Sequence, residues 1–174
     1  MYACRFETPL GEMAAVVDDA GALRRLDFLS GRDGIEPAAV LYPRRGADVR
    51  RQLAEYFQGR RKVFDLALAP GGTPFQKEVW SAVVGIPYGE SASYSEIARR
   101  IGRRDAVRAV GAANGANPIS IVIPCHRVIG RDDSLTGYGG GLPLKRWLLD
   151  HEAGWRRLPL GPARRPPTAA PPAS

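Results

Sequence analysis

The chain has 174 residues, of which 44% are hydrophobic and 25% are charged, and its net charge is +7. This composition is typical of a globular protein and excludes collagen-like and wholly disordered chains. No apolar run approaches the roughly 20 residues that cross a bilayer, and the first residues do not form a secretory signal. We therefore expect a cytoplasmic protein without a membrane partner.

The positive charge is unevenly distributed. Residues 156–174 combine four arginines with many prolines and alanines and no acidic residue, so we expect a disordered, dispensable tail. Asp105 is the only acidic residue among five closely spaced arginines, Arg99, Arg100, Arg103, Arg104 and Arg108. That stretch fits either a binding site for a polyanionic partner or a solvated helix face, and charge alone favours neither interpretation. The excess of arginine over lysine hints at a bacterial source.

Cysteine and histidine are scarce, and the chain holds only Cys4, Cys125, His126 and His151. Two cysteines without a secretory signal predict free thiols in a reducing compartment. The four residues show neither Cys-x-x-Cys nor His-x-x-x-His spacing, so we expect no metal. Nothing in the sequence indicates a cofactor.

Residues 1–69 predict a small sheet domain. Short β-rich runs alternate with turn residues, and one segment has helical spacing of its apolar residues. In chain order the expected elements are strands at 2–8, 12–17 and 22–29, a hairpin turn at 18–21, a helix at 47–57 and a strand at 62–68. The Ala-Pro-Gly-Gly run at 69–72 predicts the domain boundary.

Residues 70–155 are predicted to be mostly helical. Capping boxes at residues 73–76 and 93–96 each predict the start of a helix. Asp105 is the expected cap of a third helix that runs to about Gly115. A fourth helix is expected over 142–151.

The second and third of these helices, joined by a few residues and flanked by arginines, are similar to a helix-turn-helix. Arg108, Ala112 and Gly115 share one face of the third helix. Such a face cannot read bases with long side chains, but it lets the backbone approach a narrow groove. Close helix–helix packing explains the same small residues, and the residues alone favour this explanation over approach to a groove.

Residues 119–123 form an apolar, strand-like run that leads into Pro-Cys-His-Arg-Val at 124–128. A lone cysteine on such a run is usually a small buried hydrophobe. A thiolate, however, is a strong nucleophile, and a nearby base or cation promotes its formation. The polar companions of Cys125 favour a reactive thiol, and they are Asn117, His126, Glu152 and Tyr138 of the glycine-rich loop 137–141.

Together these motifs resemble the methylated-DNA–protein-cysteine methyltransferases, also called O6-alkylguanine-DNA alkyltransferases. The resemblance covers residues 73–153, and residues 1–68 resemble the N-terminal domain of that family more loosely. The motifs that carry it are Arg-Ala-Val-Gly at 108–111, Asn-Pro at 117–118, Ile-Pro-Cys-His-Arg-Val-Ile at 123–129, Gly-Tyr-Gly-Gly-Gly at 137–141, Lys-Arg-Trp-Leu-Leu at 145–149 and Glu152.

The resemblance implies an α+β fold. A small ribonuclease-H-like sheet domain is followed by a mostly helical, winged-helix-like domain with a helix-turn-helix. It also implies catalytic roles for five residues. Cys125 is the alkyl acceptor, His126 is the base that acts on it through a water, and Glu152 holds that histidine. Asn117 is the hinge of the active-site turn, and Tyr94 crowds the 3′ phosphate and donates a proton to the departing base.

The resemblance implies DNA and substrate contacts as well. Arg108 replaces a flipped nucleotide in the base stack, and the helix that carries it enters the minor groove. The expected DNA-binding residues are Arg108, Ala109, Ala112, Gly115 and Arg127. The expected pocket residues are Pro124, Tyr138 and Gly139, the last in place of a hydroxyl residue found in some relatives.

The implied function is irreversible, single-turnover transfer of an alkyl group from O6-alkylguanine in double-stranded DNA to Cys125, by a monomer without a cofactor. O4-alkylthymine is a second candidate substrate. One alternative is a thiol hydrolase that uses Cys125, His126 and Glu152, although it has no need of an arginine-rich helix pair. The other is a DNA-binding redox or alkylation sensor, although the face with Ala112 and Gly115 offers few base-reading side chains.

Overall fold

The computed structural model describes residues 1–29 and 40–153, so the predicted tail at 156–174 lies outside the described residues. The chain begins with an antiparallel meander of β1 (Tyr2–Thr8), β2 (Gly11–Val17) and β3 (Leu23–Phe28). This confirms the three predicted strands. The short β4 (Val40–Leu41) pairs parallel with β1, which gives the sheet order β3-β2-β1-β4.

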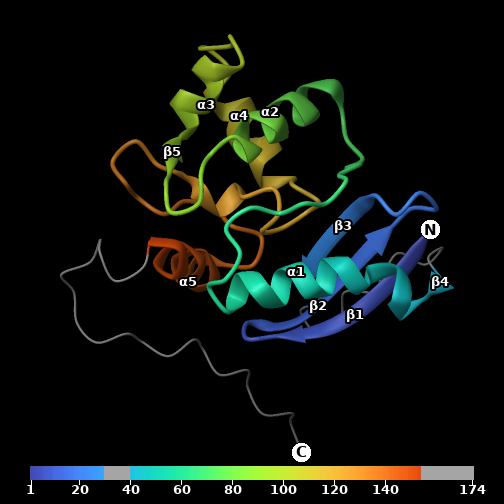
Figure 1. The fold of residues 1–174 in the computed structure, drawn as a ribbon. Coiled ribbons are helices and arrows are strands. Elements are labelled where there is room, and N and C mark those ends of the chain that lie inside the picture. Colours follow the sequence, from blue (N-terminus) through green and yellow to red (C-terminus); the bar gives the residue numbers. More distant parts are fainter. Residues whose placement is uncertain (30–39, 154–174) are drawn as a thin grey trace, which may run out of the picture.

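The turn between β2 and β3 follows the predicted hairpin. The Asp18 carboxylate accepts hydrogen bonds from the backbone N–H groups of Ala20 and Ala22, which is typical of an aspartate that stabilises a turn. After the 3-10 helix Pro43–Gly46, helix α1 (Ala47–Phe57) packs against the sheet and buries Val49, Leu53 and Tyr56 (Figure 1). The predicted helix at 47–57 is therefore confirmed.

The strand predicted at 62–68 is wrong. Only Leu68 forms a bridge, parallel to Leu23, while the fourth strand of the sheet is the exposed pair Val40–Leu41. The β-rich composition of residues 62–68 predicted a strand there. Backbone pairing, which defines a strand, is limited there to the bonds that Leu23 makes with the backbone of Ala67 and Ala69.

The second part of the chain is mainly helical, and most of its helices lie above the sheet in Figure 1. It contains α2 (Pro74–Val84), α3 (Tyr94–Arg100), α4 (Val107–Gly115) and α5 (Leu142–Ala153). Two short strands, β5 (Ala92–Ser93) and β6 (Val128–Ile129), pair in parallel beside the helix-turn-helix α3–α4. A sheet followed by mainly helical structure confirms the α+β class.

Both predicted capping boxes are present. Thr73 accepts a hydrogen bond from the Gln76 N–H, and Ser93 accepts one from the Glu96 N–H, with the reciprocal bonds also formed. The predicted cap at Asp105 is wrong, because α4 begins one residue later with Ala106 as an N-cap that makes no side-chain bond. No helix in the described ranges is long and apolar enough to cross a membrane.

The two parts of the chain touch at the edge of the sheet. Leu26 of β3 accepts a hydrogen bond from the Ser120 N–H and donates its own N–H to the Pro118 carbonyl. Leu26 and Ile119 are both fully buried. The edge of β3 therefore holds the start of the turn that leads to Cys125, while the predicted boundary near residue 69 stays a prediction.

Candidate active site and DNA-binding surface

The residues before Cys125 form a compact buried turn. Asn117 ties this turn together, because its Nδ2 donates to the Ile123 carbonyl at 2.8 Å while its Oδ1 accepts from the Ile119 N–H at 2.9 Å. The strand-like run predicted at 119–123 is therefore wrong. Ile121 even adopts a φ of 70°, which is costly for a β-branched residue and is maintained here by complete burial.

Cys125 follows this turn at the start of the 3-10 helix Cys125–Arg127. Its side chain is buried, and burial raises the pKa of the Cys125 thiol, while the Asn117 amide and the charge of Lys145 oppose that rise. The Asn114 amide donates from α4 to the Cys125 carbonyl at 3.3 Å. The thiol is therefore protonated at rest and needs a base before it can act as a nucleophile.

His126 directly follows Cys125 in the chain, and its imidazole can act as a base. It is fully buried, and its Nε2 lies 2.7 Å from Oε1 of Glu152 on α5. Burial lowers the pKa of His126, and the bond to Glu152 only partly opposes this effect. Nδ1 of the ring has no hydrogen-bond partner among the described residues. With Nε2–H directed at a carboxylate, Nδ1 is the atom able to accept a proton.

Arg127 departs from its predicted place on the DNA surface. Its side chain is buried, and it binds the Glu152 carboxylate through Nε at 2.8 Å and Nη2 at 3.0 Å. Nη1 donates to the Ile86 carbonyl at 2.6 Å. The guanidinium points inward because a buried carboxylate needs a charged partner there, so the prediction of a DNA contact is wrong.

Two further donors complete the surroundings of Glu152. The Tyr56 hydroxyl of α1 donates to Oε1 at 2.7 Å, and the Gly89 N–H lies 3.4 Å from Oε2. Burial tends to raise the pKa of Glu152, but the bonds and charges of His126 and Arg127 prevail and lower it to about 2. Glu152 is therefore an anion at neutral pH. Tyr56 could not be assigned to the site from the sequence, because it lies 96 residues before Glu152 in the chain.

Tyr94 lies at the start of α3, against Gly111 of α4, where an added Cβ would meet the tyrosine ring at 3.8 Å. Its hydroxyl accepts a hydrogen bond from Thr136 Oγ1 at 3.0 Å, so its own proton remains available to another acceptor. Lys145 holds the loop that contains Thr136, because its Nζ donates hydrogen bonds to the carbonyls of Val128 and Thr136. Lys145 is a further buried residue whose role the sequence did not reveal.

Two of the predicted pocket residues, Tyr138 and Gly139, lie in the loop between β6 and α5. The Tyr138 hydroxyl is buried without a hydrogen-bond partner in the described part of the chain. Its pKa is raised well above 10, mainly by burial and to a smaller extent by the charge of the nearby Cys125. Pro124 is buried, whereas Gly139 is exposed. A Cβ at Gly139 would meet no atom within 4 Å, so the space beside it is open.

The predicted DNA face of α4 is exposed. Arg108, Ala109, Ala112 and Gly115 all lie on the surface, while Val110, Ala113 and Asn114 face the core. Trp80 of α2 fixes the inner side of the helix, because its Nε1 donates to the Ala113 carbonyl at 2.8 Å. Within the part of the chain that the structure describes, Ala109, Ala112 and Gly115 are thus not buried by packing.

Comparison with known proteins agrees with this geometry. Residues 74–154 match the family model described as 6-O-methylguanine DNA methyltransferase, DNA binding domain. The chain is 50% identical to a methylated-DNA–protein-cysteine methyltransferase of Methanosarcina barkeri over 154 residues, which span 87% of this chain and 97% of that one. A relative of the same name from Salmonella typhimurium is 47% identical, over 85% and 93% of the two chains.

The chain belongs to the methylated-DNA–protein-cysteine methyltransferase family. Among solved structures it resembles Mycobacterium tuberculosis OGT in complex with DNA, with a TM-score of 0.83 and 42% identity over 88% of this chain and 93% of that one. The O6-methylguanine methyltransferase of the same organism gives a TM-score of 0.80.

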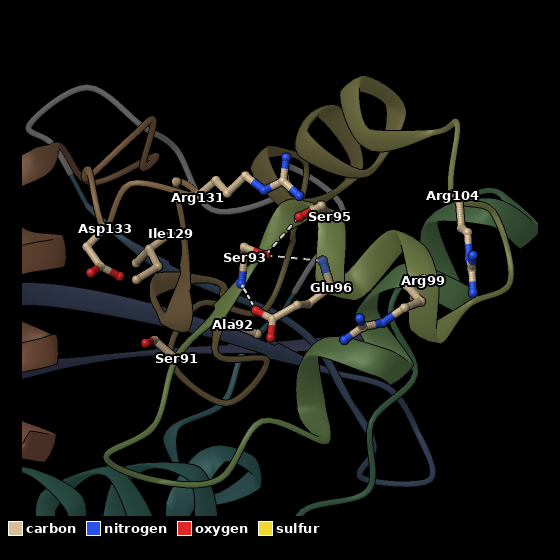
Figure 2. A pocket seen from close by; sticks show the side chains of 11 residues that line it. Ser91, Ala92, Ser93, Ser95, Glu96, Arg99, Arg104, Ile129, Arg131 and Asp133 are labelled. Atoms are coloured by element: carbon tan, nitrogen blue, oxygen red, sulfur yellow. Dashed lines mark hydrogen bonds between the residues drawn. The ribbon is translucent and has the colours of Figure 1, made fainter.

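This family member also has an open hollow of about 640 Å³ beside the helix-turn-helix (Figure 2). Cys125 does not line it, so it is separate from the thiol site. Three arginines from three segments border it, namely Arg99 of α3, Arg104 of the turn before α4 and Arg131 of the loop after β6. None of the three guanidinium groups makes a hydrogen bond or ion pair with a described residue.

Within residues 1–29 and 40–153, no group of three or more His, Cys, Asp or Glu side chains is placed to hold a metal ion. Cys4 lies in β1, far along the chain from the other cysteine and the histidines, and is itself buried.

Proposed function

We propose that this protein repairs O6-alkylguanine in duplex DNA by transferring the alkyl group to Cys125, once per molecule. The observation that carries the proposal is a buried thiol that adjoins a histidine held by an anionic carboxylate, next to an exposed helix-turn-helix. Membership of the family supports the same reaction.

The first step is activation of the thiol. Glu152 accepts the Nε2–H bond of His126 and so fixes the tautomer in which Nδ1 is basic. Nδ1 then takes the Cys125 proton through a water, and the resulting imidazolium is stabilised by the Glu152 carboxylate. Because the thiolate forms in a buried site, it is poorly solvated and reactive.

The second step is displacement at the alkyl carbon. A bond forms from the Cys125 sulfur to that carbon while the bond from the carbon to guanine O6 breaks. The electron pair of the broken bond stays on the base, which is a better leaving group when protonated. The Tyr94 hydroxyl accepts from Thr136 and keeps its own proton, so it is suited to protonate the base.

DNA binding precedes both steps. The target atom is inside the duplex, so the base has to be flipped out, at a cost of about a few kcal/mol. The small residues of α4, such as Ala112 and Gly115, let the helix approach a narrow groove closely. Arg108 is exposed on the same helix, and a planar cation can fill the gap in the stack.

No group in this site can cleave the thioether product, so each molecule reacts once. We propose in addition that the protein acts as a monomer. The test is mass spectrometry after incubation with O6-methylguanine duplex. We expect a single methyl group on the peptide that holds Cys125, loss of this product in Cys125→Ala, and full reaction in Cys4→Ala, which removes the other buried cysteine. An unmodified protein, or one that turns over many equivalents as a hydrolase does, would refute the proposal.

A further inference from the structure

The Glu152 carboxylate receives one donor from the N-terminal part of the chain. The Tyr56 hydroxyl lies 2.7 Å from Oε1, the same oxygen that faces Nε2 of His126 at 2.7 Å. Arg127 Nη2 is a third donor to this oxygen, at 3.0 Å. The remaining contacts of the carboxylate, from Arg127 Nε and the Gly89 N–H, are to Oε2.

We propose that Tyr56 is a positioning residue for alkyl transfer, which sets the proton affinity of His126 by sharing the Oε1 atom of Glu152. The N-terminal domain thereby takes part in the chemistry through a single hydroxyl. This inference rests on the proposed function for its kinetic consequence, but its effect on the imidazole does not depend on DNA.

The position of Tyr56 is rigidly fixed. Its side chain is fully buried, and its ring contacts the rings of Phe57, Phe64, Tyr88 and His151. The backbone carbonyl of Tyr56 also lies 2.8 Å from His151 Nε2 on α5. The hydroxyl therefore has little freedom to leave Glu152.

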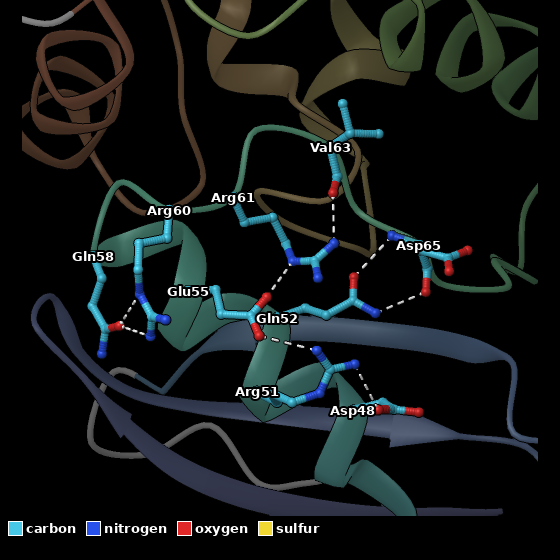
Figure 3. A network of polar contacts seen from close by, with 9 residues as sticks. All are labelled: Asp48, Arg51, Gln52, Glu55, Gln58, Arg60, Arg61, Val63 and Asp65. Atoms are coloured by element: carbon cyan, nitrogen blue, oxygen red, sulfur yellow. Dashed lines mark hydrogen bonds and ion pairs between the residues drawn. The ribbon is translucent and has the colours of Figure 1, made fainter.

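Helix α1, which carries Tyr56, is in turn anchored to the segment that follows it (Figure 3). The Gln52 side chain bonds both the N–H and the carbonyl of Asp65, each at 2.8 Å. Glu55 binds Arg51 and Arg61 on its two oxygens. These contacts hold the helix independently of the active site, so the helix can act as a fixed support for the hydroxyl.

The physical argument concerns competition for one oxygen. Each donor to a carboxylate stabilises its charge and lowers its affinity for a further proton. With Tyr56 in place, Oε1 attracts the proton of His126 Nε2 less strongly. Removing the hydroxyl should strengthen that attraction, stabilise the imidazolium and raise the pKa of His126.

Other charged and titratable groups also act on His126. Arg127 of the same 3-10 helix and Lys145 of α5 disfavour the imidazolium, whereas Glu152 favours it. Tyr88, in the loop before β5, and Tyr138, in the loop before α5, lie near Glu152 as neutral phenols. None of these groups is altered by a change at position 56, so the effect of the hydroxyl can be isolated.

The chain offers a matched control. Tyr88 touches the Tyr56 ring at 6.0 Å between centroids and lies under the Arg127 guanidinium at 5.8 Å. Its hydroxyl nevertheless makes no hydrogen bond with any residue that the structure describes. Tyr88→Phe therefore removes a phenolic oxygen from the same neighbourhood without removing a donor to Glu152.

The experiment is an NMR titration of the imidazoles in the full chain, without DNA. The chain has only two histidines, so a His151→Gln variant assigns the signals. We expect Tyr56→Phe to raise the pKa of His126, because the carboxylate loses one of the donors that compete for its Oε1 atom. Tyr88→Phe should leave that pKa unchanged.

Two further variants test the route of the effect. In a Glu152→Gln background, Tyr56→Phe should cause no additional shift, because the shared oxygen no longer carries a charge. Site-specific 3-fluorotyrosine at position 56 keeps the side chain shape and makes a stronger donor, so it should lower the pKa of His126. This variant also preserves the test if the phenylalanine variant does not fold.

The kinetic consequence is a shift of the acid limb of the transfer rate toward higher pH in Tyr56→Phe, in parallel with the imidazole. A variant that loses thermal stability without a change in the His126 titration would show that Tyr56 is only structural and would overturn the proposal. An equal shift in Tyr88→Phe would do the same. If the imidazole shifts while the wild-type protein transfers no alkyl group, the proposed function fails and the positioning role stands.

Discussion

Arg127 and Glu152 form a two-point ion pair inside the protein, with Nε at 2.8 Å from one carboxylate oxygen and Nη2 at 3.0 Å from the other. A planar guanidinium that binds both oxygens fixes the plane of the carboxylate. That plane determines where Oε1 meets His126 Nε2. Arg127, which directly follows Cys125 and His126 in the sequence, therefore orients the carboxylate that binds the histidine.

Replacing Arg127 should destabilise the protein. Arg127→Met keeps an apolar chain but leaves the Glu152 charge without its ionic partner, and breaking a buried pair in this way costs about 3–5 kcal/mol. Urea unfolding measures this loss. The control is Arg108→Ala, which removes an exposed arginine and should change the free energy of unfolding by less than about 0.5 kcal/mol. A stable Arg127→Met variant with weakened DNA binding would instead restore the original surface role.

The Glu152 carboxylate should make stability depend on pH in the acid range. Its pKa falls from 4.5 in the unfolded chain to about 2 in the folded protein. A depressed pKa contributes stability that is complete above pH 4.5 and is lost as the pH falls toward 2. Urea midpoints measured across this range should decline steeply in the wild type and less steeply in Glu152→Gln. Asp48→Asn, on the exposed side of α1, should keep the wild-type slope.

The local elements were largely predictable from sequence because their signals are local. The capping boxes at Thr73 and Ser93, the three meander strands and the exposed face of α4 follow from residue patterns over a few positions. The turn at 119–123 was not predictable in this way, because its shape depends on the Asn117 amide and on the edge of β3. An apolar run is equally compatible with a strand or a buried turn.

The sequence predicted which residues form the reactive centre, but not which other side chains they contact. Cys125, His126 and Glu152 carried a recognisable chemistry, yet whether Arg127 faces DNA or the interior depends on which side of a 3-10 helix it occupies. The contribution of Tyr56 depends on a contact between the two parts of the chain. Such long-range contacts leave no periodic trace in a single sequence.

Arg108 should matter for duplex substrates more than for a free base. The side chain lies on the exposed face of α4, outside the buried thiol site, so it does not contact the reacting atoms. Arg108→Ala should slow transfer from O6-methylguanine in a duplex by at least tenfold and leave transfer from free O6-benzylguanine nearly unchanged. Single-turnover rates with the two substrates measure the difference. Equal slowing with both would mean that the arginine supports the fold or the pocket and does not stabilise an extruded base.

The arginines around the hollow should contribute to DNA affinity through phosphate contacts. Arg104 and Arg131 come from separate segments, and no described residue pairs with their guanidinium groups. Their position beside the helix-turn-helix suits the backbone of a duplex bound to α4 (Figure 2). A cation that contacts a phosphate adds about 0.9 to the slope of log affinity against log salt.

The measurement uses undamaged duplex and the Cys125→Ala protein, so that no transfer occurs during the titration. Arg104→Gln and Arg131→Gln should each lower the salt slope by about 0.9 if each contacts one phosphate. The control is Arg50→Gln, an exposed arginine on α1 away from the helix-turn-helix. The slope should not change in this control, since long-range charge is screened within about 10 Å at 0.1 M salt. If all three variants lower the slope equally, only net charge acts, and the arginines of the hollow hold no particular phosphate.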